Sequence, residues 1–150
     1  MKPLLVLVTV FFLSIIIAKV AFGNYHFALS GRISLSAMLL FSAIGHFAFN
    51  KGMSLMIPVF IPYKAELVYL TGVLEMLFAV ALFFPDYRIS VGWLIIGFLL
   101  LVLPFNIYAS LKHIDYQKAT FDGNGVGYLW FRIPLQILFI LWTYFSAIKY

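Results

Sequence analysis

Residues 91–111 read VGWLIIGFLLLVLPFNIYASL, a stretch without a single charged side chain. A helix needs about 20 mainly apolar residues to cross the hydrocarbon core of a bilayer. This stretch is long enough, and it lies between an arginine at position 88 and a lysine at position 112. It therefore predicts a transmembrane helix with a charged residue near each end.

Four further stretches have the same character. They are Pro3–Phe22, Ile33–Phe49, Leu67–Phe84 and Leu129–Ile148. The breaks between the stretches contain Gly, Pro or charged residues, which mark turns and contact with water. We therefore expect one all-α integral membrane domain over residues 1–150, a polytopic helical bundle with five spans.

Composition supports the membrane assignment. Of the 150 residues 65% are hydrophobic and only 10% are charged, against about 25% charged in soluble domains. A soluble domain of this size leaves much of its chain exposed and would not hide so much apolar surface. An ordinary soluble enzyme, a disordered chain and a usual nucleic-acid module are therefore excluded. The net charge of +5 favours contact with lipid headgroups, so the expected partner is the bilayer and not a nucleic acid.

The first span and the orientation leave alternatives open. Lys2, the apolar run that follows it and the small residues before Asn24 also suit a signal peptide. Lys19 between that run and the cleavage position favours a retained helix. We call the side that holds loops 51–64 and 112–127 side A, and the opposite side B. Lysines and arginines divide almost evenly between the two sides, so the positive-inside rule does not choose an orientation.

The sequence predicts no metal site and no thiol chemistry. It has no cysteine, which excludes disulfides and thiolate ligands. His113, Asp115 and Asp122 offer metal-ligand atoms, but a solvated loop explains them better. The glycines of residues 123–127 do not complete a phosphate-binding motif, because Tyr128 follows them and no strand precedes them.

Five polar residues lie inside the apolar stretches. They are Glu75, Arg132, Gln136, Asn106 and His46. Such groups are costly in a membrane, so they usually face a protein interior and have partners. At about 1.5 Å of rise per residue, all five lie about 5–12 Å from side A. We therefore expect a buried polar cluster or ligand pocket in that half of the membrane, with Arg132 in reach of Glu75 if their helices are neighbours.

Other features point to the same half. Pro104 frees the carbonyl of Leu100, and Asn106 is placed to bond with opened backbone groups. Gly72, one turn from Glu75, permits close helix approach. The apolar segment Gly52–Tyr63 is expected to lie in the interface or to form a lid.

Each polar residue also has a structural interpretation. A Glu–Arg pair can fix helix register, and an Asn beside a proline can patch the backbone. His46 suits an interfacial position, and Gln136 suits an interhelical hydrogen bond.

Several ordered motifs carry a family resemblance. They are AIGHF (43–47), MIP (56–58), IPY (61–63), LVYLTGVLE (67–75), FPDYR (84–88), PFNIY (104–108) and YLWFRIPLQ (128–136). Over about residues 32–149 the chain resembles the DoxX-like family of small bacterial membrane proteins. The resemblance implies a four-helix core, with Pro3–Phe22 as an extra N-terminal helix. It also implies that the core starts and ends in the cytoplasm, which places side A outside the cell.

The resemblance also suggests a function. The family is named for a subunit of a thiosulfate:quinone oxidoreductase, and the five polar residues match its recurrent polar positions, which have no established catalytic role. We therefore expect an accessory subunit of a redox complex in the bacterial inner membrane, or a protein that binds a quinone or another lipid-like ligand, rather than an autonomous enzyme. No haem, flavin or iron–sulfur motif is evident. The alternatives are a scaffold for other membrane subunits or for a homo-oligomer, and less favourably a small-solute transporter, because five spans leave little room for inverted repeats.

Overall fold

The computed structural model describes residues 2–150, and in this part of the chain the protein is helical with no named strand. Its elements are α1 (Lys2–Phe22), α2 (Phe27–Ala48), α3 (Asn50–Leu55), α4 (Lys64–Ala81), α5 (Arg88–Leu111), the 3-10 turn η1 (Val126–Tyr128), α6 (Leu129–Thr143) and the π-helical end η2 (Tyr144–Lys149). An isolated bridge between Asp115 and Thr120 is the extended pairing within these residues. The expectation of an all-α chain is confirmed.

Four helical segments are long and apolar enough to cross a membrane. They are α1, α2, α5 and the continuous segment Val126–Lys149. The chain is therefore a membrane protein. The fifth expected span corresponds to α4, which begins and ends three residues earlier than the apolar stretch. It carries Lys64, Glu66 and Glu75 in 18 residues, so its crossing of the bilayer stays a prediction.

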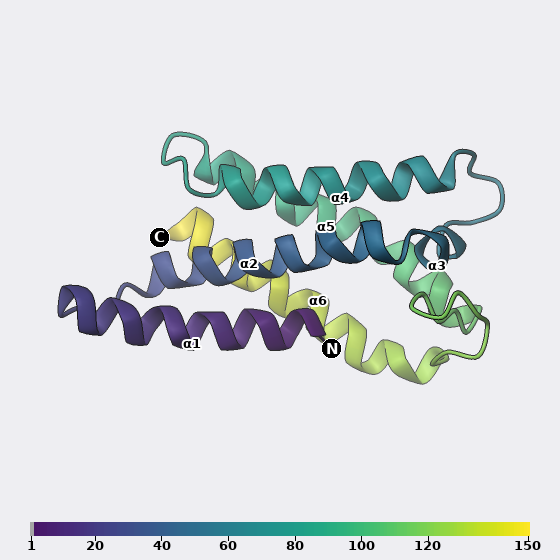
Figure 1. Cartoon of the computed structure of the whole chain (residues 1–150), viewed down its shortest axis with the longest axis horizontal. Coiled ribbons are helices and arrows are strands. Elements are labelled where there is room, and N and C mark those ends of the chain that lie inside the picture. Colours follow the sequence, from purple (N-terminus) through teal and green to yellow (C-terminus); the bar gives the residue numbers. More distant parts are fainter. Residues whose placement is uncertain (1) are drawn as a thin grey trace.

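The bundle is organised around α2. Figure 1 shows α2 between α1 and α4, with α5 and α6 behind it, and α2 packs most extensively on α1 and α4. Most residues of the core come from α2, α5 and α6, including Leu35, Leu39, Ile95, Leu135 and Phe139, and α1, α4 and η2 also contribute to it. In a bilayer the lipid is as apolar as these side chains, so close packing rather than escape from water holds the helices together.

The first helix is held mainly by α2. Leu7 is fully buried in the core, and Leu7 and Ala18 are the buried residues of α1. In Figure 1 the described start of α1 lies near the middle of the bundle, while its other end extends beyond the start of α2. The first turn of α1 therefore lies at the level of the core and not at the side A end of the bundle.

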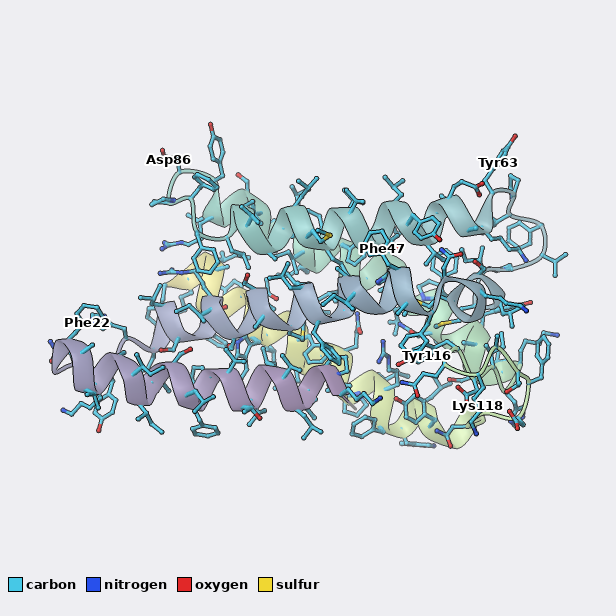
Figure 2. All side chains as sticks on the ribbon, viewed as in Figure 1. Phe22, Phe47, Tyr63, Asp86, Tyr116 and Lys118 are labelled. Atoms are coloured by element: carbon cyan, nitrogen blue, oxygen red, sulfur yellow. The ribbon has the colours of Figure 1, made fainter. Side chains whose placement is uncertain are left out.

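A cap formed by α3 and the two loops covers the side A end. Gly52 is buried, and a Cβ there would clash with the carbonyl group of Tyr116, so α3 packs directly on the loop between α5 and α6. Tyr63, Tyr116 and Lys118 lie at this end in Figure 2. Val59 and Phe60 are 83% exposed, a position that suits the lipid interface.

Candidate functional site

The site begins with a close approach of α2 and α4. Gly72 lies one turn before Glu75, and a Cβ at Gly72 would come 2.9 Å from the Cβ of His46. Real Cβ atoms need about 3.5–4.0 Å between carbons, so only glycine permits this separation. Because the helices are so close here, Glu75 is buried, with 6% of its surface exposed.

Glu75 has its partners on α2. The Ser42 hydroxyl donates a hydrogen bond to Glu75 Oε1 (3.2 Å), and His46 Nδ1 lies 3.2 Å from Glu75 Oε2. The same Nδ1 lies 3.0 Å from the Ser42 carbonyl oxygen. A carbonyl oxygen only accepts, so this contact places a proton on Nδ1. Because this proton serves the contact with the Ser42 carbonyl, Glu75 Oε2 stays buried without a hydrogen bond, even though Nδ1 is 3.2 Å away.

Arg132 of α6 pairs with an amide on α5. Its Nη2 donates to Asn106 Oδ1 (3.3 Å), and Asn106 Nδ2 donates to the carbonyl of Val102 (3.2 Å). Asn106 therefore bonds to the backbone of its own helix, but to the carbonyl of Val102 and not to the Leu100 carbonyl that Pro104 frees. Arg132 Nε is buried and has no hydrogen-bond partner.

Gln136 completes the polar set on α6. It is buried, and its Nε2 donates to the carbonyl of Leu99 at 2.6 Å. Leu99 lies in the part of α5 just before Pro104, which interrupts the helical hydrogen bonds there. The predicted interhelical hydrogen bond of Gln136 is thus present and joins α6 to α5.

A cavity of about 70 Å³ connects these groups. Ser42, Glu75, Arg132 and Gln136 are its polar lining, Pro3 closes it from α1, and the remaining lining residues are apolar side chains of α2, α5 and α6. Three of the five predicted site residues therefore lie on one cavity. Asn106 and His46 are not part of the lining, but each contacts a residue that is. Segment 52–63 contributes no lining residue, so it caps the bundle end and is not a lid on this cavity.

The expected pairing of Glu75 with Arg132 is not formed. His46 with Glu75 is the pairing of a basic and an acidic side chain found within residues 2–150, and it is an ion pair when the imidazole is protonated. The reason is the order of the helices, because α4 packs on α2 and makes almost no contact with α6. Sequence reasoning also missed Ser42. It precedes His46 by four residues and so shares its helical face, which was the available signal.

The loop that contains His113, Asp115 and Asp122 is held by its own hydrogen bonds. Asp115 Oδ1 accepts hydrogen bonds from the backbone N–H groups of Gln117 (3.0 Å) and Lys118 (3.2 Å). The Thr120 hydroxyl donates to the exposed Asp122 carboxylate, and this hydrogen bond lowers the pKa of Asp122 from its usual value. No group of three metal-ligating side chains is found in the described part of the chain.

Comparison with known proteins identifies one family. A family model described as "Domain of unknown function (DUF8561)" matches residues 35–147. This range contains all five predicted site residues and the core helices, and it leaves out α1. No curated protein and no solved structure matches the chain. The match covers well over half of the sequence, and the chain therefore belongs to the DUF8561 family.

Proposed function

We propose that the protein binds a small lipid-soluble molecule with a hydrogen-bonding head group, a quinone in the first place, in the cavity beside Glu75. In this proposal it serves as an accessory subunit of a redox complex in the inner membrane of a bacterium. The electron donor belongs to a partner subunit, and this chain supplies binding and orientation. The resemblance to the DoxX-like family supports the link to redox complexes.

One observation carries the proposal. Glu75 Oε2 and Arg132 Nε are both buried and neither makes a hydrogen bond, although Oε2 lies 3.2 Å from His46 Nδ1, and Glu75 and Arg132 line the same cavity. A buried polar group without a partner costs about 1–3 kcal/mol, and more when it is charged. One atom is an acceptor and the other a donor. A ligand that offers both kinds of group would therefore relieve both costs.

A quinone has this chemistry in its two states. The carbonyl oxygen of the oxidised form accepts from an arginine N–H, and the hydroxyl of the reduced form donates to a carboxylate. The apolar lining from α2, α5 and α6 suits the ring, because ligand sites are mainly apolar with a few placed polar groups.

The cavity volume limits how the ring enters. About 70 Å³ is the share of roughly two water molecules in the liquid, whereas benzene occupies an engineered cavity of about 150 Å³. A cavity of this size admits only the polar edge of the quinone head group, so the ring must displace part of the cavity lining. Pro3 marks the most movable part, because α1 is anchored by few buried side chains.

A matched pair of variants on α4 tests the proposal. Glu75→Gln removes the buried charge, and Glu66→Gln makes the same change at an exposed position of the same helix. Each protein is purified in mild detergent from quinone-containing bacterial membranes, and bound quinone per protein is measured by mass spectrometry. A hydrogen bond to a charged group contributes about 1.5–3 kcal/mol. We therefore expect the Glu75→Gln protein to retain at least about tenfold less quinone than the wild type.

The controls make either result decisive. Wild type and Glu66→Gln should retain equal amounts, and all three proteins should have the same helical circular dichroism and elution volume. Absence of quinone from the wild type, or equal retention by the two variants, would overturn the proposal.

A second candidate function is that of a scaffold for other membrane subunits, and the hydrogen bonds that join α4 to α2 and α3 support it. Ser36 Oγ donates to the Ala79 carbonyl (2.9 Å), and Asn50 Nδ2 donates to the Ala65 carbonyl (3.0 Å). Together with the Ser42–Glu75 bond, they tie α4 to α2 and α3 along much of its length. If the polar cluster only scaffolds a complex, Glu75→Gln and Arg132→Met will both reduce the recovery of co-purifying subunits. Intact assembly with lost ligand would contradict that function.

A further inference from the structure

A groove lies on the opposite part of the bundle, toward side B. Its volume is about 350 Å³, and its walls come from Phe11 of α1, Ala28 of α2 and Leu138, Leu141 and Trp142 of α6. This volume lies within the range of about 300–1,000 Å³ that is usual for small-molecule sites. The lining is almost wholly apolar, and the groove is formed by segments that qualify as membrane-spanning. It therefore suits a hydrocarbon chain.

One arginine lies beside this groove, and a second lies on α5, which packs on the groove-lining segment η2. Arg32 follows Gly31, a lining residue, and its Nη1 donates to the carbonyl of another lining residue, Ser146 (3.4 Å). Arg88 begins α5, and one turn later Gly92 packs on η2, where a Cβ would come 3.2 Å from Ala147, the neighbour of Ser146. The start of α5 and Arg32 thus meet the same segment, and the like charges of Arg32 and Arg88 repel each other. Arg88 Nε is buried and has no hydrogen-bond partner.

No carboxylate compensates these charges. Within residues 2–150, neither arginine has a carboxylate at ion-pair distance. Asp86 lies two residues before Arg88, but it is exposed and Figure 2 shows it at the outer edge of the turn between α4 and α5. Lys19 and Lys149 add further positive charge at side B. Two unbalanced cations at the boundary of a low-dielectric region favour an anion between them.

The anion that best fits is a phosphate that also carries an acyl chain. Guanidinium groups bind phosphate through paired N–H donors, and Arg88 Nε is an unused donor. The groove starts next to Arg32, so a phosphate held there places an attached hydrocarbon chain in the groove. We propose that side B of the bundle binds one anionic phospholipid, with its phosphate between Arg32 and Arg88 and one acyl chain in the groove.

Native mass spectrometry of the detergent-solubilised full chain tests the headgroup. The protein is titrated with dipalmitoyl phosphatidylglycerol, with dipalmitoyl phosphatidylcholine and with inorganic phosphate. We expect the wild type to bind phosphatidylglycerol about tenfold more tightly than phosphatidylcholine, and Arg32→Gln with Arg88→Gln to lose that preference. The control is Lys51→Gln with Lys64→Gln, which removes the same charge near side A and should leave the preference for phosphatidylglycerol unchanged.

A second pair of variants tests the groove and leaves both arginines in place. Ala28→Trp fills the groove, whereas Leu29→Trp adds an equal ring one residue away, outside the lining. We expect Ala28→Trp to weaken phosphatidylglycerol binding about tenfold and Leu29→Trp to leave it unchanged.

Three results would overturn the proposal. They are equal affinity for the two phospholipids, equal affinity of the two tryptophan variants, and displacement of phosphatidylglycerol by millimolar inorganic phosphate, which would indicate a site for a free anion. If the double arginine variant does not fold, the tryptophan pair still decides.

Discussion

Replacing Gly72 by alanine would test the contact on which the candidate site depends. The new Cβ would come 2.9 Å from His46 Cβ and 3.4 Å from a ring carbon of Phe47. The first of these atoms is next to the backbone, so it does not move without α2. To reach about 3.5 Å, the helices must separate locally by about 0.6 Å, and overpacking of this kind costs about 1–3 kcal/mol.

A gain from helix propensity does not offset this cost. Alanine is favoured over glycine in a helix by about 1 kcal/mol, but that figure applies when unfolding also melts the helix. A membrane helix keeps its backbone hydrogen bonds while it dissociates from its neighbours. We therefore expect Gly72→Ala to lower the free energy of unfolding by about 1–3 kcal/mol.

The assay is unfolding with dodecyl sulfate in mixed micelles, followed by tryptophan fluorescence. Gly97→Ala is the matched control, because a Cβ at Gly97 meets no atom within 4 Å and the residue also lies inside a helix. The control should unfold at the wild-type concentration of dodecyl sulfate or slightly above it. Equal stability of the two variants would refute the close contact of α2 with α4.

Three further changes test other contacts by the same unfolding assay. Ser36→Ala removes the bond to the Ala79 carbonyl and should cost about 0.6 kcal/mol, the average for such bonds in a membrane; a cost equal to that of exposed Ser90→Ala would contradict it. Leu7→Ala should cost about 1–3 kcal/mol, because it leaves a cavity in the core, whereas Phe12→Ala on the lipid-facing side of α1 should be nearly neutral. Gly52→Ala should prevent normal folding of the cap, since its Cβ has no space beside the Tyr116 backbone; a wild-type yield and unfolding midpoint would show that the cap adapts.

The helices could be predicted from the sequence, but their exact ends could not. Hydropathy finds the residues that suit hydrocarbon, whereas a helix begins where the backbone permits. Thus α4 begins at Lys64, directly after Tyr63 in a left-handed conformation (φ 56°). Likewise, α2 begins at Phe27, six residues before the apolar stretch expected from Ile33. The π-helical winding of Tyr144–Lys149 has no signal in the apolar pattern.

The depth of the candidate site in the membrane could be predicted from the sequence, but the neighbours of each residue could not. Counting residues from the ends of the spans placed Glu75, Arg132 and Gln136 at similar depth, and the structure brings all three to one cavity. Depth does not say which helices are neighbours. Because α2 lies in the centre of the bundle and packs on α4, Glu75 contacts Ser42 and His46 of α2 and not Arg132. Serine is common in spans as an ordinary packing residue, so Ser42 became recognisable only when its partner was known.

The glycine contact between α2 and α4 also has a mechanical consequence. Two helices that touch through backbone-proximal atoms and are joined by side-chain bonds cannot slide past one another without breaking several contacts at once. They behave as a fixed frame, and α1, which has only two buried residues, is the part of the bundle most free to move against it. Hydrogen–deuterium exchange would display this division as slow exchange in α2 and α4 beside faster exchange in the first turns of α1.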